Sequence, residues 1–285
     1  MKFDFSYVDI VLKAAANEGD INEITSTIAY DTIQKHVKMT GSKFNVNMLI
    51  DALNGATNAG YGLRNLSQNL NDIKKIVAQL KTKTNEWQTI ISKEVTNIFK
   101  NCNLSQTIIC PVIGYDIGIG IDNVVCINLN VAICKDIKEI FSIAIHETAH
   151  TVSEQLEKYF DFTSKNSFLQ TISYLIQYEG IGIFSAYNYR TVNDLPYYGY
   201  PALEDYIISD IKYENLKNLY NTLTEMNNNS LVSLEEMKNK TYSGKRLTHR
   251  LGYEIVFRAY KQHGIQEVRS IAQMSNDEFK SKYLL

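Results

Sequence analysis

Apolar residues recur every three or four positions along the first hundred residues, the spacing that the buried face of an α-helix produces. Gly, Asn and Lys-Thr sequences interrupt this spacing where helices are expected to begin and end. The pattern predicts an entirely helical region, with helices over residues 5–16, 21–39, 45–59 and 63–80. We therefore expect an N-terminal helical bundle over residues 1–104.

The fourth of these helices carries a heptad-like line of apolar residues that continues beyond it. The line comprises Leu63, Leu66, Leu70, Ile73, Val77 and Leu80, followed by Trp87, Ile91, Val95 and Ile98. Such a line is buried either against other helices of the same chain or against a second copy of the chain. Packing within one chain is the simpler interpretation, and dimerisation through this line is the alternative.

The pattern changes in the middle of the chain. Residues 107–113 and 123–131 are rich in β-branched residues, some of which alternate with polar ones. This pattern predicts two short strands on either side of a glycine-rich turn at residues 114–120. Asn128 and Asn130 fall on the polar face of the second strand.

Helical spacing returns after these strands. It is found just before residue 146, over residues 167–187 and over residues 246–263, where Gly264 marks the end of the helix. Together the elements predict a mainly helical α+β protein. Residues 105–285 would form a second region after the bundle, or the two regions would form one continuous domain.

Composition and charge exclude several classes of protein. The chain has 285 residues, of which 45% are hydrophobic and 21% charged, and its net charge is −2, so neither nucleic acid nor an anionic membrane is an expected partner. No run of eighteen apolar residues predicts a membrane span. The first nine residues include aspartates where a signal peptide would be apolar. We expect a cytoplasmic protein, or a secreted or periplasmic one whose signal has been removed.

Four cysteines, Cys102, Cys110, Cys126 and Cys134, lie in apolar surroundings and form no C-x-x-C pair. This placement is typical of buried thiols in a reducing compartment. Disulfide pairing in a secreted protein is the alternative.

The chemistry of the chain centres on His146-Glu147-Thr148-Ala149-His150, an H-E-x-x-H string within a helical pattern. Residues four apart on a helix project from one face, so both imidazoles can bind one zinc ion. Glu147 would then lie beside the metal and take a proton from zinc-bound water. The alternative is an ordinary helix that carries two histidines.

Zinc needs a third protein ligand. The continuation H-x-x-G-x-x-H is absent, because Ser153 stands where that pattern has glycine and Leu156 stands where it has the third histidine. Glu179 is the better candidate, because it falls on the apolar stripe of the 167–187 helix, where a carboxylate needs a cation or hydrogen-bond donors. An ordinary buried salt bridge of Glu179 is the alternative.

Three other acidic residues are weaker candidates for the third ligand. Asp161 lies past the end of the H-E-x-x-H helix, at a position that some zinc peptidases use, but its local sequence gives little support. Glu154 and Glu157 continue that helix and, with Lys158, are typical of a solvated face.

At these residues the chain resembles the gluzincin-type peptidases, and more closely a group of bacterial zinc-dependent proteases. The resemblance covers roughly residues 105–280 and rests on H-E-x-x-H, on Glu179-Gly180 and, more weakly, on Gly252-Tyr253. It implies a zincin-like catalytic half that hydrolyses peptide bonds at a single zinc. Many members of the closer group have no established substrate.

The resemblance also implies how substrate would bind. In gluzincin-like enzymes an edge strand beside the catalytic helix pairs with an extended peptide, so Asn128 and Asn130 would line that cleft. A small structural sheet is the alternative. Tyr197 and Tyr198 would grip apolar side chains at the rim of the cleft, unless they only pack a turn.

Hydrolysis further needs a hydrogen-bond donor that stabilises the oxyanion. His249 and Tyr253 lie four residues apart on the 246–263 helix and share a face. The resemblance favours Tyr253, with His249 second; a core tyrosine and a surface histidine are the alternatives. Arg246 and Arg250 would bind a substrate carboxylate, although a solvated basic face is the simpler interpretation.

The sequence thus predicts a zinc metallopeptidase with one zinc ion per chain, bound by His146, His150 and Glu179, and with Glu147 as general base. A peptide or protein is the expected substrate. A zinc hydrolase of a small amide or ester is one alternative, and a non-catalytic helical interaction protein with a vestigial metal site is another. The sequence does not define the cleavage preference, endo- or exopeptidase action, or the oligomeric state.

Overall fold

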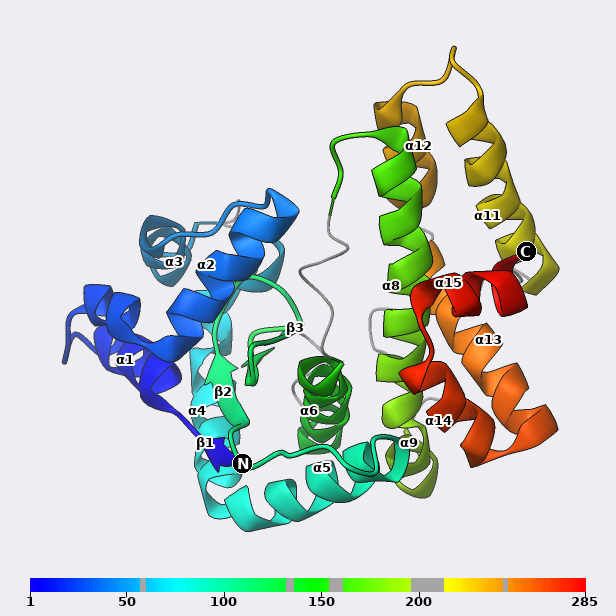
Figure 1. Cartoon of the computed structure of the whole chain (residues 1–285). Helices are drawn as coiled ribbons and strands as arrows, with labels where there is room; N and C mark the ends of the chain where they lie inside the picture. Colours follow the sequence, from blue (N-terminus) through cyan, green and yellow to red (C-terminus); the bar gives the residue numbers. More distant parts are fainter. Residues whose placement is uncertain (57–59, 132–135, 154–160, 196–212, 243–245) are drawn as a thin grey trace. The chain divides into compact units, whose positions relative to one another are not determined.

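The structure of the protein is a computed structural model of the whole chain, shown in Figure 1. It describes all residues except 57–59, 132–135, 154–160, 196–212 and 243–245. The fold is α+β and mainly helical, with one small sheet. Contacts divide the chain into two compact units. The first comprises residues 1–96 and 101–152, and the second comprises residues 97–100 and 153–285.

The first unit is built on a four-stranded sheet with the order β1-β2-β4-β3. Its strands are β1 (Lys2–Phe3), β2 (Ile108–Val112), β3 (Gly118–Ile121) and β4 (Val124–Asn128). The first three strands in that order run parallel, whereas β3 is antiparallel to β4. The two predicted strands are confirmed as β2 and β4.

The short strand β1 corrects the expectation that the first hundred residues are entirely helical. The N–H of Lys2 donates to Thr107 O, and the N–H of Asp4 donates to Ile109 O, each at 2.9 Å. These bonds tie the beginning of the chain to β2. Contacts therefore join residues on both sides of residue 104, and the first unit extends to residue 152.

The edge strand β3 corrects the expectation of a turn over residues 114–120. Glycine is a poor strand former, but it is needed where another backbone approaches closely. A β-carbon built on Gly118 would come within 2.5 Å of Glu147 Oε1, and one built on Gly120 would collide with the backbone oxygen of Glu147. Small residues therefore let the strand lie directly on the helix that carries Glu147.

That helix, α6 (Ile137–Val152), covers one face of the sheet and packs on β3 and β4 (Figure 1). Asp136 precedes it and accepts a hydrogen bond from the N–H of Lys138, which satisfies one of the open donors of the first turn. The opposite face of the sheet is covered by α2 (Ile28–Thr40), where the Cys126 thiol contacts Ala29 O at 3.8 Å.

The predicted N-terminal helices are present, with shorter bounds. They are α1 (Ser6–Ala15), α2, α3 (Val46–Leu53) and α4 (Leu66–Thr82), followed by α5 (Thr84–Ile98). The predicted 21–39 helix is divided, because Thr27 adopts extended backbone and caps α2 after a 3-10 turn, Ile21–Ser26. A second 3-10 turn, Tyr61–Leu63, precedes α4.

From Leu63 to Val95 the heptad-like line is buried within the first unit, which confirms packing within one chain. Leu70 alone along it is half-buried. Trp87 is 1% exposed and makes edge-on contacts with Phe3 and Phe141, at centroid distances of 5.5 and 4.5 Å. The line therefore anchors α5 to β1 and to α6, and it is not left open for a second copy.

The second unit is helical in its described part. Its elements are α8 (Lys165–Ser185), α9 (Tyr187–Val192), α11 (Tyr213–Asn228), α12 (Leu234–Tyr242), α13 (Leu247–His263), α14 (Ile265–Gln273), α15 (Asn276–Phe279) and a π-helical end, Lys280–Leu284. The helices predicted over 167–187 and 246–263 are confirmed as α8 and α13, and Gly264 ends α13 with φ +74°. No helix in the described ranges is long and apolar enough to cross a membrane.

Helices α8 and α13 lie side by side in the second unit and form its most extensive helix pair (Figure 1). They approach most closely at two glycines. A β-carbon on Gly180 would come within 2.5 Å of the Gly252 carbonyl carbon, and one on Gly252 would collide with Ile176 O. Only glycine at both positions allows this backbone approach. The two sequence pairs Glu179-Gly180 and Gly252-Tyr253 are therefore parts of one helix crossing.

Candidate metal centre

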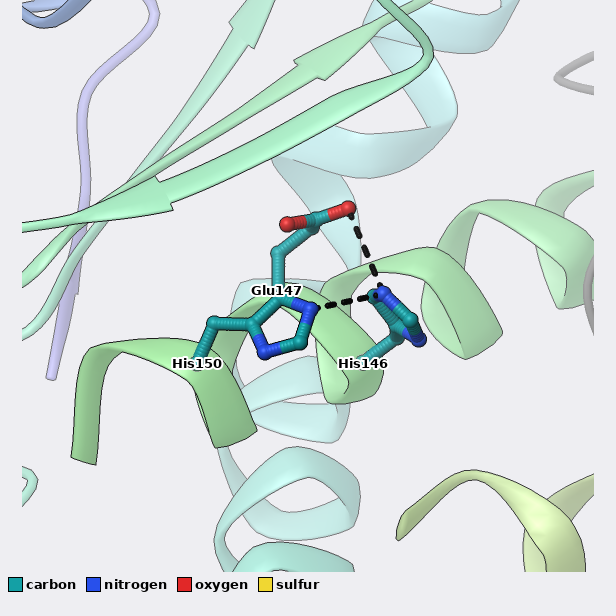
Figure 2. A group of neighbouring side chains, drawn as sticks. All are labelled: His146, Glu147 and His150. Carbon is teal, nitrogen blue, oxygen red and sulfur yellow. Dashed lines mark hydrogen bonds and ion pairs between the residues drawn. The ribbon is translucent and has the colours of Figure 1, made fainter. Parts of the chain in front are cut away.

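The H-E-x-x-H string forms a compact cluster on the last turns of α6. His146, Glu147 and His150 are 2%, 4% and 6% exposed, and one ligand atom from each lies within 4.8 Å of the others. The two Nε2 atoms are 2.9 Å apart, and His146 Nε2 lies 3.9 Å from Glu147 Oε1. Figure 2 shows the imidazole rings converging while the carboxylate rises toward the strands.

This spacing fits a zinc ion. Two imidazole nitrogens bound tetrahedrally at roughly 2.0–2.1 Å from zinc are about 3.3 Å apart. The observed separation of 2.9 Å is close to that value, so small rotations of the two rings would admit the ion. Burial adds a reason for a cation, because a carboxylate is costly to remove from water unless a cation or hydrogen-bond donors compensate its charge.

The edge strand β3 lies beside this cluster. Its glycines contact Glu147, and a β-carbon on Gly120 would also lie 3.1 Å from His150 Cβ. The N–H of Asn128 in β4 donates to Ile117 O, so by the alternation of an antiparallel ladder Gly118 and Gly120 direct their N–H and C=O groups away from β4. Among the strands that the structure describes, β3 pairs with β4 alone.

This strand was not predicted from the sequence. The signal was present in Ile117-Gly118-Ile119-Gly120-Ile121, where isoleucine alternates with glycine at the period of a strand. The glycines obscured it, because glycine is more typical of turns.

Asn128 and Asn130 do not line a cleft, contrary to the expectation. They are 0% and 6% exposed. The side-chain oxygen of Asn128 accepts hydrogen bonds from the N–H groups of Gly114 and Asn130, both at 3.0 Å. The amide groups of both asparagines donate to Gly62 O. These residues therefore hold the loop before α4 against the end of the sheet.

Glu179, His249 and Tyr253 gather at the α8/α13 crossing of the second unit. Glu179 Oε2 lies 3.4 Å from His249 Nε2, with side-chain exposures of 14% and 19%. Glu179 is therefore less buried than the apolar residues that share its stripe. Tyr253 is 3% exposed and stacks on Phe257 at a centroid distance of 5.6 Å. The glycine crossing brings Glu179 close to His249, which lies seventy positions later in the sequence.

The three predicted zinc ligands belong to both units. His146 and His150 lie in the first, and Glu179 lies in the second. The complete ligand set therefore remains a prediction, as does the alternative in which Glu179 forms an ordinary ion pair, for which His249 is the neighbouring partner.

The weaker candidates have other surroundings. The Asp161 carboxylate is exposed and accepts hydrogen bonds from the N–H and the hydroxyl of Thr163, at 2.8 and 2.6 Å, which lower its pKa. Asp161 therefore stabilises the turn before α8. Glu154, Glu157 and the residues of the predicted tyrosine rim lie outside the described residues.

The side chain of Arg250 is buried in the second unit. Arg250 is 8% exposed and burial lowers its pKa, so the expectation of a solvated basic face is wrong for this residue.

Cys110 and Cys126 are buried free thiols, as expected, and Cys102 is a half-buried one. A hydrogen bond with Cys110 and burial raise the pKa of Cys126 well above its ordinary value, and the nearby Glu147 raises it further.

Most of the chain matches one known protein family. Residues 17–283 match the model of a family described as "Putative zinc dependent peptidase (DUF5700)". The chain belongs to this family. The family region begins inside the N-terminal helices, so it extends well before residue 105, where the resemblance seen in the sequence began. No curated protein matches the chain significantly, and no solved structure does so either.

Proposed function

We propose that the protein is a zinc metallopeptidase that hydrolyses peptide bonds with one zinc ion per chain. The observation that carries this proposal is the buried cluster of His146, Glu147 and His150 directly beneath an edge strand. Membership of a family described as zinc-dependent peptidases supports the same activity.

The metal would be bound by His146 and His150 from α6 and by Glu179 from α8. Bound zinc supplies a water molecule of lowered pKa and polarises the carbonyl group of the substrate. His249, at 3.4 Å from Glu179, would hold that carboxylate in position by a hydrogen bond. His249 is thus a positioning residue in this proposal, which leaves Tyr253 as the preferred oxyanion donor.

Glu147 would act as the general base and then as the general acid. Its carboxylate lies between the imidazoles of α6 and the strand β3, with Oε1 close to Gly118. From this position it would take a proton from the attacking water and give it to the leaving amine. Burial favours this role, because proton transfer is then shielded from bulk water.

The substrate would bind to the outer edge of β3. The N–H and C=O groups of Gly118 and Gly120 point toward that edge, and they would pair with an extended peptide. Because both glycines contact Glu147, a peptide paired there would pass over the general base. This replaces the expected role of Asn128 and Asn130 in substrate binding.

The test combines zinc quantitation with a screen of a proteome-derived peptide library. Glu147→Gln should keep about one zinc per chain and lose on the order of 10²–10⁴-fold in turnover. The matched control is Glu139→Gln, because Glu139 is also buried on α6 but lies about 12 Å along the helix axis. It should keep zinc and turnover. Undiminished cleavage by Glu147→Gln would refute the assigned base.

Two outcomes would favour the alternative functions. Hydrolysis of model esters or small amides, with no peptide cleaved, would indicate a small-molecule hydrolase. Zinc well below one equivalent in native protein, with no turnover, would indicate a vestigial site in an interaction protein.

A further inference from the structure

A pocket of about 230 Å³ lies at the beginning of β3, within the first unit. Its apolar lining includes Phe44, Met48 and Leu63, and Tyr115 forms another part of its wall. Lys43 and Asp116 lie at exposed positions around it. None of these residues belongs to the metal cluster on α6.

The walls of this pocket are held in place by specific contacts. Tyr115 has φ +75°, a conformation that an aromatic residue keeps only where its surroundings fix it. Its hydroxyl lies 2.8 Å from His36 Nδ1 and 3.2 Å from Thr40 Oγ1, and its ring contacts Phe44 at a centroid distance of 5.7 Å. The pocket is therefore a built feature, although it is not part of the zinc chemistry.

Its position connects it with the edge strand β3, which contacts Glu147. Asp116 precedes Gly118 by two residues, which is a distance of about 7 Å along an extended chain, and Gly118 contacts Glu147. A peptide paired antiparallel to β3 would have its C-terminal part beside Asp116 and Tyr115, since the two chains run in opposite directions. A side chain one or two positions after the cleaved bond would thus reach the pocket.

We propose that this pocket is a specificity subsite for a bulky apolar side chain, preferably an aromatic one, on the C-terminal side of the cleaved bond. The volume is sufficient, because a cavity of ~150 Å³ holds benzene. The aromatic rings of Phe44 and Tyr115 and the thioether of Met48 favour an aromatic occupant. Lys43 and Asp116 have opposite charges, so the rim favours neither an acidic nor a basic side chain.

This inference rests on the proposed peptidase function. It is tested with pairs of peptides in which one residue is either Phe or Ala. In one pair that residue is the first after the cleaved bond, and in the other pair it is the second. Wild-type protein should cleave the Phe peptide with a kcat/KM roughly 10- to 100-fold higher at one of these positions. Met48→Trp, which fills the pocket, should abolish this preference by lowering kcat/KM for the Phe peptide to that of the Ala peptide.

Met226→Trp is the matched control, because Met226 is also half-buried but lies on α11 and does not line the pocket. It should keep the preference. A second variant, Asp116→Asn, removes one rim charge and should raise kcat/KM for a Glu peptide up to about fivefold. Asp116 is exposed, so this variant tests the subsite even if Met48→Trp does not fold.

The outcomes separate the two proposals. If peptides are cleaved without a Phe preference, or if Met48→Trp keeps that preference, the subsite is refuted and the peptidase function stands. If wild-type protein with one bound zinc cleaves no peptide, the peptidase function is refuted, and the subsite with it.

Discussion

The contact between Gly118 and Glu147 gives the most discriminating prediction. Gly118→Ala would place a β-carbon 2.5 Å from Glu147 Oε1, about 0.9 Å short of the 3.4 Å at which ordinary contact begins. The colliding atoms, Oε1, Cγ and Cδ, all belong to the Glu147 side chain, so a change in its torsion angles can move the carboxylate away. The substitution should therefore displace the Glu147 carboxylate, the proposed general base, by about 1 Å and leave the fold largely intact.

The expected effect of Gly118→Ala on stability is much smaller than its effect on catalytic rate. Overpacking costs about 1–3 kcal/mol, here at the lower end, and replacing glycine by alanine returns ~0.4–1 kcal/mol through the unfolded chain. The net loss of stability should thus stay below about 2 kcal/mol, or roughly 2–8 °C in Tm. A misplacement of about 1 Å can cost on the order of 10²-fold in rate, so kcat should fall far more than stability.

Gly120→Ala provides the contrast, because its β-carbon would collide with the backbone oxygen of Glu147. A helix backbone cannot move aside as a side chain can, so we expect about 3 kcal/mol or more of destabilisation. Gly19→Ala is the neutral control, since its β-carbon would meet only ordinary contact with Lys13. The assays are thermal unfolding by circular dichroism and peptide cleavage. Wild-type kcat in a folded Gly118→Ala variant would refute the placement of Glu147 against β3.

Three further predictions concern the ligands, the helix crossing and the buried asparagine. Glu179→Ala should weaken zinc binding by more than the 10–100-fold expected for His249→Ala, as measured by competition with a chelator, and equal affinities in wild type and Glu179→Ala would exclude Glu179 as ligand. Gly252→Ala should destabilise the second unit by about 3 kcal/mol, because the β-carbon would collide with Ile176 O; an unchanged urea midpoint would contradict the close crossing. Asn128→Ala leaves the N–H groups of Gly114 and Asn130 without their acceptor, so it should lower the free energy of unfolding by roughly 2–4 kcal/mol. A change in peptide preference without loss of stability would instead indicate that Asn128 contacts the substrate.

The helices could be predicted from the sequence because their pattern is local. Hydrophobic spacing of three and four located α8, α13 and most of the N-terminal helices, and it placed both histidines of H-E-x-x-H on one face. A helix is made of hydrogen bonds between residues four apart, so neighbouring residues contain most of the information about it. The cluster on α6 was therefore readable before any tertiary contact was known.

Contacts between distant residues could not be read in this way. The strand β1 forms only because it pairs with residues more than a hundred positions later, and β3 forms because its glycines fit against α6. Asn128 has the alternation of a cleft residue in the sequence, yet it is buried because the loop at Gly62 covers it.

What the sequence by itself determined is the H-E-x-x-H string on one helix and the mainly helical character of the chain. Only the tertiary structure decided that Gly180 and Gly252 touch, that β3 lies on Glu147, and that a pocket opens at Tyr115. The physical reason is that close backbone approach and cavity shape depend on how separate elements pack, and a single glycine in a sequence does not say which backbone will approach it.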